Sequence, residues 1–210
     1  MALIWHHENQ VVEKTAEAVV RYLNQCAEER EPVLLLISGG SWLSILDFVE
    51  IPAHADVTIS VVDERFSTDP EINNFAQITQ TKFYHQIEER ALPVISTLVT
   101  PGENRDLHAA RFEDALREWR SDHPRGRVLA LLGMGPDGHT AGIFSGVYSN
   151  EVMQSTFFDS QQWVHAYTVP FEINPYPERI TVTGSFLVHV VDAAILFVQG
   201  ESKCKILADV

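Results

Sequence analysis

Short, largely apolar runs constrain the fold of this chain more than any other feature of its sequence. Most of them show no alternation of polar and apolar residues, which is the pattern of strands covered on both faces in a parallel sheet. Six such runs are predicted to be strands: Val33–Ile37, Val57–Val62, Val94–Val99, Val128–Leu132, Trp163–Thr168 and Ala193–Val198.

Helical periodicity fills several of the segments between these runs. Apolar residues share one helix face before the first run, and they recur at spacings of three and four before the run at Val128. Glu71–Arg90 is also expected to be helical, and a further helix is expected to begin near Trp42. Helices between buried parallel strands form right-handed crossovers. The sequence therefore predicts a three-layer α/β/α sandwich with a Rossmann-like, mostly parallel sheet.

The chain has 210 residues with no repeat or linker, so we expect one domain over residues 1–210. Its formal net charge of −14 argues against nucleic acid or an anionic membrane as a partner. No apolar run approaches the roughly 18 residues that span a bilayer, and no signal peptide is recognised. Cys26 and Cys204 lack CxxC or metal-ligand spacing, so we interpret them as reduced thiols of a cytoplasmic protein, with a disulfide as the alternative.

Glycine-rich or charged segments directly follow four of the predicted strands. They are Ser38–Ser41, Asp63–Arg65, Gly133–Gly142 and Gly200–Lys203. Ligands of open α/β sheets bind beyond the carboxyl ends of the strands, where these segments should meet. In so acidic a chain, an anionic ligand must be held by local cations and backbone N–H groups.

The first of these segments is a candidate anion cradle. Gly39 and Gly40 allow close approach of the backbone to a ligand, and Ser41 stands before a predicted helix whose N-terminus favours negative charge. A tight turn between strand and helix explains the same residues equally well. Neither GxxxxGK[ST] nor GxGxxG is present, so those nucleotide-binding motifs have no support here.

Charged side chains after the second strand give a weaker signal. Arg65 has the geometry to bind a phosphate or carboxylate with two N–H groups, and Asp63 or Glu64 has the charge to hold it in place. The alternative is a solvated loop with a structural ion pair. Asn73 and Asn74 are candidate caps of the next helix.

The turn GMGPDGHTAG, at Gly133–Gly142, carries the strongest candidate for chemistry. Histidine side chains ordinarily have a pKa of about 6.5 and can take a proton from water at neutral pH, so His139 is suited to this role, and Asp137 is suited to orient the imidazole or the water. Amide groups of the glycines are candidates for stabilising an oxyanion. A structural turn with a hydrogen-bonded histidine is the alternative. No cluster has metal-ligand spacing, and GxSxG is absent.

The motifs in this order resemble the 6-phosphogluconolactonase family. LLGMGPDGHTAGIFSG is similar to that family's LLGMGxDGHTASLFPG signature, and ISGGSW, VVDERFSTDPEINNF, PERITVTGSFL and GESKCKIL are similar to its SGGSTP, DER-SN, PxRITLT and GxxKAxxL segments. The family shares a wider group with aldose–ketose isomerases and glucosamine-6-phosphate deaminases on a Rossmann-like α/β/α sandwich.

The resemblance implies hydrolysis of 6-phospho-D-glucono-1,5-lactone to 6-phosphogluconate in the oxidative pentose phosphate pathway, without a metal or organic cofactor. His139 matches the general base of the family. Arg65, Arg179 and the Gly39–Ser41 segment match groups that bind or position the phosphorylated substrate. Lys203, near a helix start that prefers anions, is a further candidate for phosphate binding.

The sequence departs from the family at three places. Trp42–Leu43 replace the usual Thr-Pro, the SN pair reads Asn73–Asn74, and Asn174 stands about where the family often has a lysine. A glucosamine-6-phosphate deaminase or isomerase is one alternative, although that group typically has GIGxDGHIAF. A non-catalytic sugar-phosphate-binding protein on the same fold is the other. We expect a monomer or a small homo-oligomer.

Overall fold

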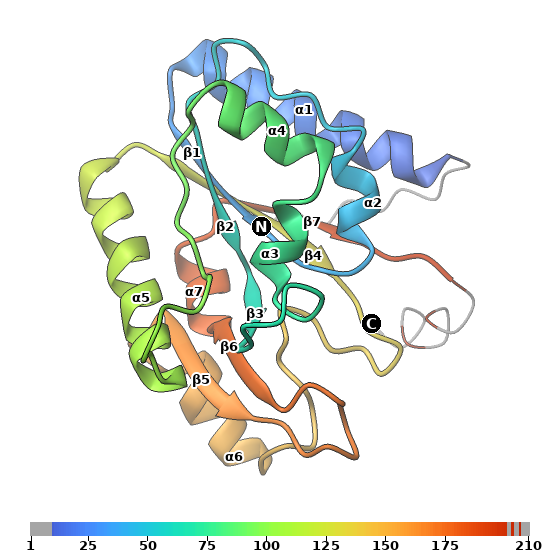
Figure 1. Cartoon of the computed structure of the whole chain (residues 1–210), viewed down its shortest axis with the longest axis vertical. Helices are drawn as coiled ribbons and strands as arrows, with labels where there is room; N and C mark the ends of the chain where they lie inside the picture. The colour runs from blue at the N-terminus through green and yellow to red at the C-terminus, as the bar shows by residue number, and fades with distance from the viewer. Residues whose placement is uncertain (1–9, 201–202, 204–205, 207–210) are drawn as a thin grey trace.

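The computed structural model describes residues 10–200, 203 and 206. At its centre lies a parallel four-stranded sheet in the order β2-β1-β4-β7 (Figure 1). Its strands are β1 (Val33–Ile37), β2 (Val57–Val61), β4 (Arg127–Gly133) and β7 (Ala193–Phe197). Every residue of β1 and β2 is buried, as expected from their apolar sequences. The predicted α/β fold class is confirmed.

Helices flank this sheet. They are α1 (Val11–Glu29), α2 (Trp42–Leu46), α3 (Asn74–Ile78), α4 (Lys82–Glu89), α5 (Arg105–Asp122), α6 (Asn150–Met153), the π-helix η1 (Gln154–Phe158) and α7 (Gly184–His189). Val19, Leu23 and Cys26 of the predicted stripe are buried in α1 together with Ala16, and α1 contacts α2 and β7. No helix in the described part of the chain is long and apolar enough to cross a membrane.

A second, antiparallel sheet was not predicted. It has the order β3-β6-β5, with β3 (Asp63–Arg65), β6 (Glu178–Val182) and β5 (Val164–Thr168). The chain passes from one sheet to the other at Val62, whose N–H donates to Ile37 at 3.0 Å and whose carbonyl accepts from Val182 at 3.0 Å. Asp63–Arg65 is therefore held at the carboxyl edge of the parallel sheet by both sheets.

Two secondary-structure predictions are wrong. Val94–Val99 is not a strand: Val94 forms a single bridge to Ile59, and Thr97 turns its hydroxyl to the carboxylate of Glu64 instead of continuing a ladder. Glu71–Arg90 is not one helix, because it divides into α3 and α4. Thr81 caps α4 by accepting a hydrogen bond from the N–H of Tyr84.

Two further predictions need adjustment. Trp163–Thr168 contains the strand β5, but this strand lies in the antiparallel sheet, not in the parallel one. The helix expected from Gly200 onward falls largely outside the described residues, which there include only Lys203 and Ile206. Cys26 is a buried free thiol, and Cys204 also lies outside the described residues.

Candidate active site

The loops after β1 and β4 lie side by side at the carboxyl edge of the sheet. Parallel pairing aligns Ile37 with Leu131, and the N–H of Ser38 donates to the Leu131 carbonyl at 2.9 Å. A methyl group placed on Gly133 would lie 3.9 Å from Oγ of Ser41. The predicted Gly39–Ser41 segment and the beginning of the GMGPDGHTAG turn are therefore neighbours.

Gly39 also meets the segment that follows β3. A methyl group on Gly39 would lie 2.7 Å from Cγ of Asn74, so only glycine allows this approach. Nδ2 of Asn74 donates to the carbonyl of Asp63 at 2.9 Å. Gly40 has a φ of +67°, a conformation that glycine adopts without strain. Asn74 thus connects the first glycine loop with β3, while Asn73 is the predicted cap and accepts from Ala76 N–H.

Asp137 and His139 form a hydrogen-bonded pair on the turn after β4. Nδ1 of His139 lies 2.5 Å from Oδ1 of Asp137, and the histidine side chain is 21% exposed. Partial burial raises the pKa of Asp137, but the hydrogen bond and charge of His139 outweigh it, so this pKa lies below its ordinary value. With Asp137 bound at Nδ1, Nε2 is the nitrogen of the imidazole left for proton transfer.

The backbone of Gly135 lies in close contact with this pair. A methyl group on Gly135 would overlap the His139 ring and would lie 2.7 Å from Oδ1 of Asp137. The N–H of Gly135 donates to the His139 carbonyl at 2.8 Å, and the N–H of Gly138 donates to the Gly135 carbonyl at 3.1 Å. These two amides already donate hydrogen bonds within the turn, so they are poor candidates for the predicted oxyanion contact.

The ring of Phe144 contacts both the imidazole of His139 and the guanidinium of Arg179. The His139 ring stacks on Phe144 with centroids 4.0 Å apart, and Cζ of Arg179 lies 5.4 Å from the same ring centroid. The imidazole and the guanidinium therefore both lie against the same buried ring. The hydroxyl of Tyr167 donates to the Gly142 carbonyl and fixes the backbone beside Phe144.

The two arginines stand opposite each other, because Arg65 of β3 is the register partner of Arg179 of β6. Nη2 of Arg179 pairs with Oδ2 of Asp63 at 2.8 Å, and both side chains are buried. Arg65 instead places its guanidinium 4.5 Å from the ring centroid of Tyr176. Burial, and then the charge of Arg179, lower the pKa of Arg65. Nε of each arginine is buried without a hydrogen-bond partner.

Glu64 turns away from this site into the interior. Its fully buried carboxylate accepts hydrogen bonds from the N–H groups of Arg65, Asn74 and Phe75 and from the hydroxyl of Thr97. Burial raises its pKa to about 7, against the opposing effect of these donors. The carboxylate therefore fixes the start of α3 against β3, and Asp63 is the acid that faces Arg179.

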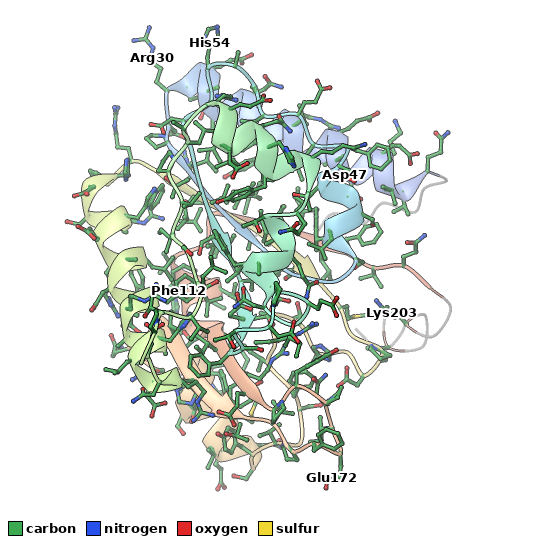
Figure 2. The ribbon with its side chains drawn as sticks, in the orientation of Figure 1. Arg30, Asp47, His54, Phe112, Glu172 and Lys203 are labelled. Atoms are coloured by element: carbon green, nitrogen blue, oxygen red, sulfur yellow. The ribbon has the colours of Figure 1, made fainter. Side chains whose placement is uncertain are left out.

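Lys203 lies on the side of the molecule where the GMGPDGHTAG turn projects (Figure 2). The side chain of Ile206 would lie 3.0 Å from a methyl group on Gly138, which places this segment beside the turn. Lys203 makes no ion pair with residues 10–200 or 206. Its predicted phosphate contact stays a prediction.

Two of the departures from the family, Trp42 and Asn174, have different structural outcomes. Trp42 is buried in the core, edge-on to Phe197, so it belongs to the packing beneath the loop. Asn174 lies in the turn between β5 and β6, where Oδ1 accepts from the N–H of Tyr176 at 3.0 Å. Sequence reasoning missed Phe144, Tyr167 and Tyr176, because a single aromatic residue carries no spacing signal.

Other features of the described residues lie apart from this cluster. Two cavities of about 430 Å³ occur elsewhere, one beside Trp163 and His189 and the other between α5 and β5. No group of three or more His, Cys, Asp or Glu side chains suited to a metal ion occurs among residues 10–200, 203 and 206.

Comparison with known proteins identifies similar sequences and folds. The model of the family described as glucosamine-6-phosphate isomerases/6-phosphogluconolactonase matches residues 6–210. The 6-phosphogluconolactonase of Neisseria meningitidis is 25% identical over 209 residues, covering 95% of this chain and 84% of that protein. The 6-phosphogluconolactonase of Xylella fastidiosa is 28% identical over 204 residues, covering 91% and 79%.

Solved structures agree on the fold. The 6-phosphogluconolactonase of Thermotoga maritima has a TM-score of 0.70 at 21% identity, covering 98% of this chain and 87% of that chain. That of Trypanosoma brucei has a TM-score of 0.64 at 20% identity, covering 91% and 80%.

Proposed function

Since this chain belongs to the family of glucosamine-6-phosphate isomerases and 6-phosphogluconolactonases, we propose that it hydrolyses 6-phospho-D-glucono-1,5-lactone to 6-phosphogluconate. The observation that carries this proposal is the Asp137–His139 pair, whose imidazole shares the Phe144 ring with Arg179. A proton acceptor and a cation thus contact the same aromatic ring, and Arg65 is the register partner of that cation. We further propose that the protein acts in the cytoplasm as a single-domain monomer or small homo-oligomer, without a metal or organic cofactor.

His139 acts as the general base in the proposed reaction. Asp137, kept ionised, accepts from Nδ1–H and holds Nε2 as the acceptor. Nε2 takes a proton from water while the water oxygen adds to the lactone carbonyl carbon. The C1–O5 bond then breaks, and the imidazolium returns its proton to the departing ring oxygen. One water and one lactone yield one hydroxy acid.

Arg65 supplies the charge that binds the phosphate, because Arg179 is already paired with Asp63. A δ-lactone is a reactive ester. Holding the lactone carbonyl beside a single general base is therefore sufficient to accelerate its hydrolysis.

The test is a coupled assay on freshly prepared lactone, corrected for spontaneous hydrolysis. His139→Gln should lower kcat by roughly 10²- to 10⁴-fold, the range for removing a general base, while binding of 6-phosphogluconate changes little. His54→Gln is the matched control, because His54 is exposed and precedes β2, at the amino edge of the parallel sheet and not at the carboxyl edge that carries the site (Figure 2).

An unchanged kcat in His139→Gln would refute the assignment of the base. Release of ammonia from glucosamine 6-phosphate by the wild type, without lactone turnover, would favour the deaminase alternative. Binding of 6-phosphogluconate without turnover of either substrate would favour a sugar-phosphate-binding protein.

A further inference from the structure

Arg65 is a half-buried cation without an ion-pair partner in the described part of the chain. No carboxylate of residues 10–200 forms an ion pair with its guanidinium. Its register partner Arg179 carries the same charge, and like charges opposite each other on neighbouring strands are unfavourable. Asp63 forms its ion pair with Arg179 and acts on Arg65 only through its charge, without an ion-pair contact. The protein therefore needs another means to hold Arg65 in this place.

Tyr176 provides that means. Its ring centroid lies 4.5 Å from Cζ of Arg65, within the range of a cation–π interaction. A carboxylate in this position would occupy the N–H groups of the guanidinium and cancel its charge. An aromatic face attracts the cation and orients its plane, yet leaves the N–H groups for an anionic ligand.

The hairpin turn between β5 and β6 fixes the tyrosine. The N–H of Tyr176 donates to Oδ1 of Asn174 at 3.0 Å, and the N–H of Asn174 donates to the Pro170 carbonyl at 3.1 Å. The N–H of Val169 donates to the Pro177 carbonyl at 2.8 Å and closes the turn. Asn174 thus supports the turn that carries Tyr176.

We infer that Tyr176 is a positioning residue that holds the Arg65 guanidinium for the phosphate group of the substrate and thereby sets the affinity for phosphorylated substrates. This inference rests on the proposed lactonase function for the identity of the substrate. It assigns to Tyr176 a role in binding and none in the chemical step, because the ring lies on Arg65 and not on the Asp137–His139 pair.

The experiment compares Tyr176→Leu, which keeps bulk without the aromatic face, with Tyr176→Phe, which keeps the face. Tyr176→Leu should raise KM for the lactone by roughly three- to thirty-fold with kcat within about twofold. Tyr176→Phe should restore a KM close to that of the wild type. Phe171→Leu is the matched control, because Phe171 is an aromatic residue of the same hairpin that is 71% exposed.

A second measurement separates positioning from folding. In an Arg65→Met background, Tyr176→Leu should change KM by less than twofold, since the cation is gone. An equal effect in both backgrounds, or a Tyr176→Phe variant as weak as Tyr176→Leu, would overturn the inference. An unaltered KM in Tyr176→Leu would do the same while leaving the lactonase function intact.

If the wild type does not hydrolyse the lactone, the proposed function fails and calorimetry with inorganic phosphate decides on Tyr176 separately. Phosphate binding that weakens several-fold in Tyr176→Leu and is retained in Tyr176→Phe would support the positioning role. Equal binding by all three proteins, or no binding by the wild type, would overturn it.

Discussion

Gly135→Ala offers a steric test of how the candidate active site is built. The new methyl group would overlap the imidazole of His139 and would lie 2.7 Å from Oδ1 of Asp137. Neither the ring nor the carboxylate can keep its place, so the hydrogen bond between them must break or bend. The overlap falls on the two groups proposed to carry out proton transfer and on no part of the hydrophobic core.

The size of the effect follows from the displacement required. An ordinary contact between a methyl carbon and a ring atom is about 3.5 Å or longer, so the imidazole must move by roughly 1 Å or more. A misplacement of this size in a reacting group is worth about 100-fold in rate. The side chain of His139 is partly exposed, so the free energy of unfolding should fall by only about 1 kcal/mol.

The assay is kcat for lactone hydrolysis, with thermal unfolding measured on the same samples. Gly133→Ala is the control two residues earlier: its methyl group would meet neighbours only at 3.9 and 4.0 Å, ordinary contact distances. We expect Gly135→Ala to lose about 100-fold in kcat and Gly133→Ala less than about threefold. Equal kcat for Gly135→Ala and the wild type would refute the reasoning, as would equal losses in both variants.

Two further predictions concern buried charge. Asp63→Asn removes the counter-charge of Arg179 and should lower the free energy of unfolding by about 3–5 kcal/mol in urea titrations, with most of the loss recovered in the double variant with Arg179→Met. Burial lowers the pKa of His108 to about 4, so its contribution to stability is present above about pH 6.5 and is lost as the pH falls to about 4. His108→Leu should therefore gain roughly 2 kcal/mol relative to the wild type between pH 7.5 and pH 5; parallel stability curves would contradict this.

The sequence was most informative where one physical cause dominates. Val33–Ile37 and Val128–Leu132 are apolar because both faces of the parallel sheet are covered, and both are strands as predicted. The loops after them could be located for the same reason, since parallel strands end at one edge. That rule led to Gly39 and His139 before any coordinates, although their roles stay predictions.

The sequence was least informative where polar side chains decide the local structure. Val94–Val99 has the composition of a strand, yet Ser96 and Thr97 take part in side-chain hydrogen bonds that a ladder would not need. β3 has only three charged residues and therefore shows no strand pattern. Its pairing with β6 depends on the passage between sheets at Val62, a tertiary feature that periodicity does not report.

This passage between sheets also explains how an acidic chain can assemble a site for an anion. It places Arg65 and Arg179 in register, and Asp63 forms an ion pair with Arg179 alone, so Arg65 has no ion-pair partner among the described residues. Asp63 has a second connection, because its carbonyl accepts from Asn74, which approaches Gly39. Through Arg179 and Phe144 the same carboxylate supports the position of His139. Substitutions at Asp63 should therefore change KM and kcat together. Substitutions at Tyr176 affect only the position of Arg65 and should change KM alone.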